Sequence, residues 1–226
     1  MRDGKLFYDR LRYRITQEEF DYQVLLDALQ EYSRPRDKIS DLLHKGVIIR
    51  VKKGIYVFGD GFRRRLFSKE LLANLIYGPS YISLEYALQF HGLIPERVEA
   101  VTSVVIGRSK DFVTPVGRFS YRRIPQEAFP IGMSRIEDKD GIAFLIAVPE
   151  KALTDYVVAD RRGRLQSEKE LELYLLDDLR LDPDGLGRLD TRLIEEIAHR
   201  YNSRKIRILA RLLRRRSTAR GEAHDG

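Results

Sequence analysis

The residues with the clearest capacity for chemistry are cations and hydrogen-bonding side chains between positions 34 and 53. Lysine and arginine neutralise phosphates, which gives affinity for nucleic acid without reading its sequence. The candidate DNA-binding residues are Arg34, Lys38, Ser40, His44, Lys45, Arg50, Lys52 and Lys53. Their density predicts a surface that binds a polyanion.

Asp37 and Asp41 lie on the same predicted helix face as these cations and would repel phosphate. Three interpretations are open. The carboxylates accept hydrogen bonds from cytosine amino groups, or they orient Lys45 and Arg34 through pairs along the helix, or the face meets protein and not DNA. A helical projection also places Arg36 nearer the buried side.

A second set of cations lies near the end of the chain, at Arg207, Arg211, Arg214 and Arg215. They fall on a helix expected over about 203–217, followed by a frayed tail. Its apolar face is expected to dock on the rest of the protein, and consists of Ile206, Leu209, Leu212 and Leu213. The outward cations then form a second functional surface, or they neutralise the acidic middle of the chain.

Catalytic chemistry is not indicated, so we expect no enzyme, no catalytic residue, no metal and no cofactor. The chain has no cysteine, and no two of its four histidines are spaced for metal ligation on a helix. Ser83, His91 and Asp155 can be imagined as a hydrolase triad, but no nucleophile elbow surrounds the serine. The better interpretation is that Ser83 caps the start of a helix that ends near His91.

The elements that must position the first cations follow from local patterns. Thr16 to Glu19 fits a capping box, and a helix with apolar residues at helical spacing is expected to follow it. A second helix is expected from Pro35 to Gly46. Two strands around a short turn, 47–51 and 55–58, then make a hairpin. This order predicts a winged helix-turn-helix whose second helix enters the major groove.

The rest of the chain predicts a mixed α/β part. Helices are expected over 67–77, 83–91, 149–158, 167–180, 190–201 and about 203–217, strands over 101–106, 117–123 and 142–148, and a turn over 182–185. A glycine- and arginine-rich stretch, Gly59–Arg65, suggests a boundary between domains 1–65 and 66–226. The expected fold class is α+β, with an N-terminal winged helix-turn-helix, a mixed α/β antitoxin-type domain and a C-terminal basic helix.

Charge is distributed unevenly along the 226 residues. The net charge of +7 divides into +5 over residues 1–65, −4 over 66–202 and +6 over 203–226, so basic ends flank an acidic middle. Basic ends favour nucleic acid as a partner.

The longest apolar run, Ile142–Val148, is far shorter than the roughly 20 residues of a membrane span, and the start lacks a signal peptide. We therefore expect a cytoplasmic protein with no membrane partner.

Three segments resemble the AbiEi-type antitoxins of type IV toxin–antitoxin systems. Ser80–Leu93 resembles their "YISL..AL..HGL" signature, Ala147–Asp155 resembles their "SPE(K/R)AL.D" segment, and Lys53–Tyr56 is similar to their "GxY" wing. The resemblance covers roughly residues 16–160. An aromatic segment, Leu6–Tyr13, and the basic tail depart from the family pattern.

The resemblance implies a function as well as a fold. It implies a DNA-binding antitoxin and transcriptional autorepressor that binds inverted repeats in its own promoter and counteracts a nucleotidyltransferase-type toxin, directly or indirectly. It also implies that Ser83, His91 and Pro149 are scaffold. The residues themselves leave two alternatives open. One is an RNA- or tRNA-binding protein, and the other is an enzyme with a site in the acidic middle.

Overall fold

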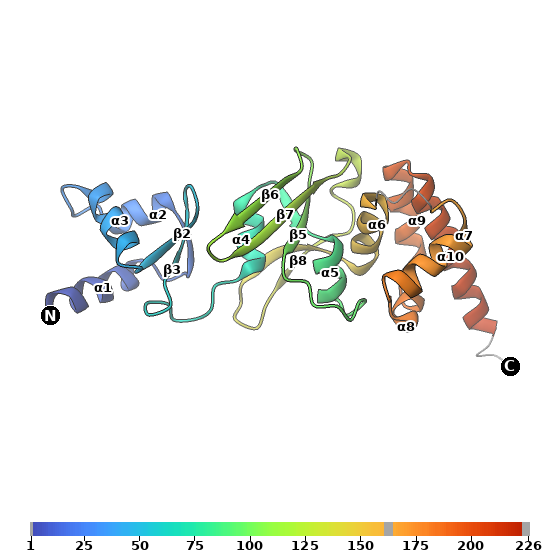
Figure 1. Cartoon of the computed structure of the whole chain (residues 1–226), viewed down its shortest axis with the longest axis horizontal. Coiled ribbons are helices and arrows are strands. Elements are labelled where there is room, and N and C mark those ends of the chain that lie inside the picture. The colour runs from blue at the N-terminus through green and yellow to red at the C-terminus, as the bar shows by residue number, and fades with distance from the viewer. Residues whose placement is uncertain (1, 161–164, 223–226) are drawn as a thin grey trace.

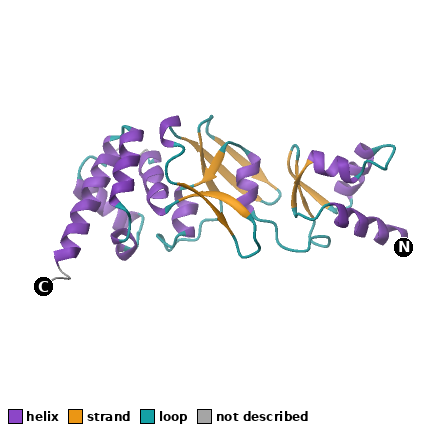
Figure 2. Cartoon of the chain, turned by 180° about the vertical axis from the view of Figure 1, so that it is seen from behind, coloured by secondary structure: helices purple, strands orange, loops and turns teal. Residues whose placement is uncertain are grey.

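The structure, a computed structural model, describes residues 2–160 and 165–222. Three parts follow one another along the longest axis, with the N-terminal and C-terminal helices at opposite ends (Figure 1). A group of helices with a small sheet comes first, then a larger sheet with its helices, then a group of C-terminal helices (Figure 2). The helices together with two separate sheets confirm the α+β class.

Residues 2–58, which we call the head, contain three helices and a three-stranded antiparallel sheet in the order β1-β3-β2. The elements are α1 (Arg2–Arg14), β1 (Glu19–Asp21), α2 (Tyr22–Ala28), α3 (Pro35–His44), β2 (Ile48–Lys52) and β3 (Ile55–Phe58). The predicted second helix and hairpin are confirmed. Gly54 in the hairpin turn has φ of +89°, a conformation that favours glycine.

The capping box predicted at Thr16 is wrong. Asp21 caps α2 instead, because its carboxylate accepts a hydrogen bond from the Val24 backbone N–H at 2.9 Å. The preceding residues form β1, which pairs with β3 and packs Phe20 against Phe58 with ring centroids 4.9 Å apart. Pairing with a distant strand therefore outweighs the local helix signal, and it places Glu19 within a sheet.

The central part is built on a six-stranded sheet in the order β6-β7-β5-β4-β9-β8. Its elements are α4 (Lys69–Ile76), β4 (Ser80–Ile82), α5 (Leu84–Phe90), β5 (Val101–Val105), β6 (Lys110–Thr114), β7 (Gly117–Arg123), a 3₁₀ turn (Gln126–Ala128), β8 (Met133–Glu137), β9 (Ala143–Ala147) and α6 (Pro149–Ala159). Strands β5, β7 and β9 confirm the three predicted ones. Strands β4, β6 and β8 were not predicted.

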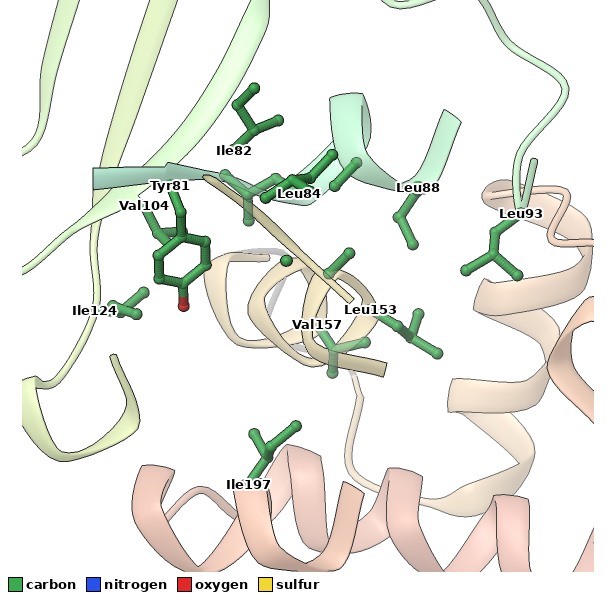
Figure 3. Packing of buried hydrophobic residues seen from close by; sticks show 14 of the residues in the cluster. Tyr81, Ile82, Leu84, Leu88, Leu93, Val104, Ile124, Leu153, Val157 and Ile197 are labelled. Atoms are coloured by element: carbon green, nitrogen blue, oxygen red, sulfur yellow. The ribbon is translucent and has the colours of Figure 1, made fainter. Parts of the chain in front are cut away.

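Helices lie on both faces of this sheet. On one face the Tyr121 hydroxyl donates to the Ala73 carbonyl of α4 at 2.6 Å. Tyr81 belongs to the opposite face and points toward α6 (Figure 3). The start of α6 at Pro149 agrees with the prediction, since proline suits the first turn of a helix.

In the described residues of the C-terminal part, every regular element is a helix. It contains α7 (Glu168–Leu173), a π-helical turn (Tyr174–Asp178), α8 (Pro183–Gly187), α9 (Thr191–Tyr201) and α10 (Arg204–Glu222). The turn predicted over 182–185 is instead the start of α8, whose first N–H groups are capped by the Asp182 carboxylate. Helix α10 continues past the predicted end at 217, and residues 223–226 lie outside the described part.

Two hydrophobic clusters stabilise the chain. One lies within the head and includes Leu11, Leu25, Leu29 and Leu42. The other joins the six-stranded sheet to the C-terminal helices, and Figure 3 shows Tyr81, Val157 and Ile197 from this cluster. It includes Ile206, Leu209, Leu212 and Leu213 of α10, as predicted. Val51 and Val57 of the head belong to this second cluster and are 4% and 0% exposed. The head sheet thus packs its second face against the central part.

Within the described residues, no helix combines the length and apolarity needed to cross a membrane.

Candidate nucleic-acid interface

Helix α3 presents one buried and one exposed face. Ile39 and Leu42 pack in the head cluster. The opposite face is polar, and its exposed side chains are Arg34, Arg36, Asp37, Ser40, His44 and Lys45. Arg36 is exposed, although the projection from the sequence places it nearer the buried side. Glycine at 46, with φ of +65°, turns the chain from α3 into β2.

The two aspartates of α3 lie in pairs along the helix, which is one of the three interpretations that the sequence left open. Lys45 donates to Asp41 at 2.9 Å, and Lys38 lies 3.5 Å from the same carboxylate. Arg34 lies 3.9 Å from Asp37. The hydrogen bond from Lys45 lowers the pKa of Asp41 and, in return, raises the pKa of Lys45. Both groups are thus fully charged at neutral pH, and the net positive charge of this face is small.

Lys38 and Ser40 are partly engaged within the head. The Lys38 ammonium lies 4.1 Å from the centre of the Phe7 ring of α1 and 5.7 Å from that of Tyr32. A cation over an aromatic face is attracted by the ring electrons, so Lys38 joins α1 to α3. The Ser40 hydroxyl donates to the Arg36 carbonyl one turn earlier, at 3.2 Å.

The three cations of the hairpin differ in their surroundings. Arg50 and Lys53 are exposed, and within the described residues neither forms an ion pair. Lys52 points toward the central part, because its ammonium donates to the Ile76 carbonyl at 2.6 Å and lies 5.0 Å from the Phe112 ring. Lys52 therefore joins the head to the central part and is not placed to contact a ligand of the hairpin.

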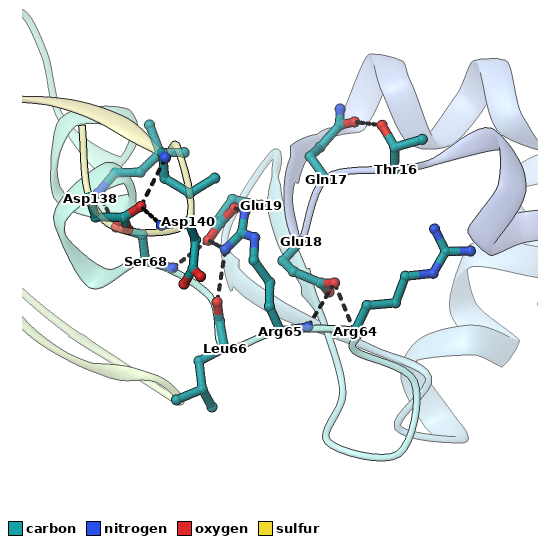
Figure 4. A network of polar contacts seen from close by, with 12 residues as sticks. Thr16, Gln17, Glu18, Glu19, Arg64, Arg65, Leu66, Ser68, Asp138 and Asp140 are labelled. Atoms are coloured by element: carbon teal, nitrogen blue, oxygen red, sulfur yellow. Dashed lines mark hydrogen bonds and ion pairs between the residues drawn. The ribbon is translucent and has the colours of Figure 1, made fainter.

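Two glutamates fix the segment that leaves the head (Figure 4). Glu18 accepts the backbone N–H of Arg64 at 2.8 Å, and Glu19 accepts the Arg65 guanidinium at 2.7 and 3.0 Å and the Ser68 backbone N–H. The hydrogen bonds between the Arg65 guanidinium and Glu19 raise the pKa of Arg65. The stretch predicted as a domain boundary is thus attached to β1, and it holds the head in a defined orientation.

Most of the C-terminal cations lie in ion pairs. The pairs are Arg211 with Glu168 (3.7 Å), Arg214 with Glu195 (3.0 Å), and Arg215 with Glu168 (3.2 Å) and Glu172 (3.6 Å). Arg207 is exposed and forms no ion pair with any described residue. These contacts favour the interpretation in which α10 neutralises acidic residues of α7 and α9.

The side chains considered as a triad do not assemble into one. Ser83 donates to Asp155 at 2.7 Å, while the His91 Nε2 lies 2.7 Å from the Ala147 carbonyl. Ser83 occupies the position before α5, but its side chain makes no capping bond. Among the described residues, no three acidic or histidine side chains gather in a way that could hold a metal ion.

Asp155 belongs to a buried polar network that the sequence did not reveal. It accepts hydrogen bonds from Lys151, Ser83 and Tyr201, and Lys151 donates to the Tyr201 hydroxyl at 2.9 Å. Lys151 and Asp155 are both 0% exposed. The network joins α5, α6 and α9, which are distant in sequence. Lysine at a helix position usually reaches solvent, so no sequence signal indicated this burial.

A scan of the chain against protein-family models and a search of curated proteins both find no match.

Proposed function

We propose that this protein is a DNA-binding antitoxin and transcriptional autorepressor in which α2, α3 and the β2–β3 hairpin form a winged helix-turn-helix. The observation that carries the DNA-binding part is the exposed polar face of α3 beside exposed cations of the hairpin. The proposed DNA contacts are Arg34, Arg36, Ser40, His44, Lys45, Arg50 and Lys53. In this arrangement α3 enters the major groove, and the hairpin binds the backbone.

The proposed operator is an inverted repeat in the protein's own promoter. One winged helix-turn-helix reads too few base pairs for specificity in a genome, so two copies are needed. Half-sites are expected about one helical turn apart, roughly 34–36 Å, or at a multiple of it. The paired aspartates of α3 fit this proposal, because Asp41 holds Lys45 and Asp37 lies near Arg34.

The antitoxin part of the proposal rests on the resemblance to AbiEi-type antitoxins. The two resembling segments of the central part pack together, since Ser83 donates to Asp155 and the His91 Nε2 lies 2.7 Å from the Ala147 carbonyl. This contact supports the interpretation of both segments as a common scaffold. The proposed partner is a nucleotidyltransferase-type toxin encoded beside this gene.

A mobility shift with promoter DNA at several salt concentrations tests the DNA-binding part. If about four phosphates are contacted, the slope of log affinity against log salt is near −4. Arg50→Ala and Lys53→Ala should each reduce its magnitude by about 1. Lys52→Ala is the matched control in the same hairpin, and its slope should equal that of the unchanged protein.

A slope near zero, or tighter binding to tRNA than to the promoter, contradicts the proposal and favours an RNA-binding protein. Footprinting that protects one short asymmetric site contradicts the inverted repeat. For the antitoxin part, coexpression with the neighbouring toxin should restore growth. Failure of rescue by a stably expressed protein contradicts that part alone.

A further inference from the structure

Helix α1, at the N-terminal end of the molecule (Figure 1), has one face that the rest of the described chain leaves uncovered. On its opposite side Leu11 and Ile15 are buried in the head cluster. Leu6 and Tyr13 are 62% and 82% exposed, although both carry large apolar surfaces. They are seven residues apart, so they lie on one line along the helix. Apolar side chains at this spacing are typical of a helix that packs lengthwise against another helix.

Two charged side chains flank this line. At 100° per residue, Asp9 lies about 50° to one side of it and Arg10 about 50° to the other. Both are exposed, and Asp9 makes no hydrogen bond or ion pair with any described residue. Arg10 lies 3.6 Å from Glu31, which also accepts from Arg14, but its side chain remains 57% exposed. The uncovered face therefore has an apolar centre, an acidic side and a basic side.

Such a face is complementary to itself in one orientation. If two copies of α1 lie parallel, about a two-fold axis along their length, the acidic side of each copy meets the basic side of the other. Leu6 and Tyr13 then meet their own counterparts. An antiparallel two-fold pair instead places Asp9 beside Asp9 and Arg10 beside Arg10, and like charges at an interface oppose binding. The face therefore fits α1 of a second copy in the parallel orientation.

The other side of α1 is attached to the proposed DNA-binding helix. The Phe7 ring lies 4.1 Å from the Lys38 ammonium of α3 and packs edge-on against Tyr32. Further along α1, Arg12 donates to Glu18 at 2.7 Å, and both side chains are buried. Because α1 and α3 are joined in this way, a contact between two copies of α1 fixes the distance between the two copies of α3.

We propose that α1 pairs with α1 of a second copy of this chain, parallel and about a two-fold axis, and thereby holds two heads on an inverted repeat. A two-fold axis is also the symmetry of such a repeat. The role on DNA rests on the proposed function, whereas the pairing itself does not. Four side chains per copy are far fewer than the roughly 20–30 residues of a stable interface. The pair is therefore weak in dilute solution and forms where two half-sites bring two copies together.

Disulfide crosslinking of the full-length protein without DNA tests the pairing, because the chain has no cysteine of its own. Tyr13→Cys, under mild oxidation at high protein concentration, should form a covalent dimer. Leu173→Cys, at an exposed position of α7, is the matched control and should form far less. Tyr13→Cys mixed with a tagged Leu6→Cys protein should give few mixed dimers, since these positions lie about 10 Å apart along α1.

Charge reversal tests the orientation. In the Tyr13→Cys protein, Arg10→Glu brings acidic side chains together and should lower the dimer yield by at least about threefold. Adding Asp9→Arg restores opposite charges and should restore the yield. Thermal melts should show each variant folded, because surface changes cost little stability. The pairing is overturned if Tyr13→Cys forms no more dimer than Leu173→Cys, if mixed dimers with Leu6→Cys predominate, or if the exchanged charges fail to restore the yield.

Mobility shifts with one and with two half-sites test the role on DNA. Leu6→Glu with Tyr13→Glu should lower the affinity for two half-sites by at least about tenfold and leave the affinity for one half-site unchanged. Unchanged affinity for two half-sites, or an equal loss on both DNAs, overturns this role. If the unchanged protein binds neither DNA, the role on DNA is overturned together with the proposed function, while crosslinking still decides the pairing.

Discussion

At the scale of single residues, the most informative pair is Lys151 and Asp155. Both are completely buried on α6, one turn apart, and their charges face each other within a hydrogen-bonded network. Burial lowers the pKa of Lys151, and the carboxylate of Asp155 opposes this shift. Removing one charge leaves the other buried without its partner, which costs far more than the pair contributes.

We therefore predict that Lys151→Ala lowers the free energy of unfolding by about 3–5 kcal/mol. The double variant Lys151→Met with Asp155→Asn removes both charges and keeps most of the volume, so it should recover much of this loss. Denaturant unfolding measures both values, with the exposed Lys139→Ala as the control. If the single and double variants are equally unstable, the loss is one of packing and the charges are not its cause.

At the scale of elements, the sequence predicted those whose signals are local. Proline at 35 and 149 and the apolar stripe of α10 predicted three helices, and the turn at Gly54 predicted the hairpin. Strands β4, β6 and β8 have no such signal, because a short strand depends on partners far along the chain. The same limit applies to the candidate site. The exposed face of α3 follows from helical periodicity, whereas Lys52 is directed by Ile76 and Phe112, which lie in other elements.

Helix α10 supplies the prediction at this scale. Its cations face Glu168 and Glu172 of α7, so the variant Arg211→Glu with Arg215→Glu brings like charges together. Exposed ion pairs contribute about 0.2–1 kcal/mol each, and we expect a loss of about 1–2 kcal/mol in the free energy of unfolding.

Two comparisons identify the cause. Arg207→Glu changes the same helix at a position without an ion pair among the described residues, and it should have little effect on stability. Adding Glu168→Arg to the double variant should restore part of the loss. A double variant as stable as the unchanged protein would show that these contacts do not matter in solution, and would favour α10 as a free basic surface.

At the scale of the whole molecule, the contact between the head and the central part decides whether the chain divides into independent halves. The fragment 66–226 contains nearly all of the second hydrophobic cluster, so we predict that it folds, neutralises the toxin and loses promoter binding. It also uncovers the surface that Val51 and Val57 bury, so its free energy of unfolding should be lower than that of the same part in the full chain by about 2 kcal/mol or more.

Denaturant unfolding and a growth assay beside a promoter mobility shift measure these outcomes, and Val57→Ala in the full chain is the matched control for the lost contact. Equal stability of the fragment and the full chain would mean that the head contributes nothing to the central part. A folded fragment that fails to rescue growth would mean that antitoxin activity needs both parts.

The attachment of residues 64–68 to Glu18 and Glu19 has a consequence for the thermodynamics of the proposed DNA binding. A head on a loose tether loses orientational freedom when it docks, and that loss opposes binding. Here the linking segment is already ordered by carboxylates that are themselves almost fully buried, at 1% and 5% exposure. If the head binds DNA as proposed, this entropy is lost during folding and not at the operator, and the head is preorganised for binding.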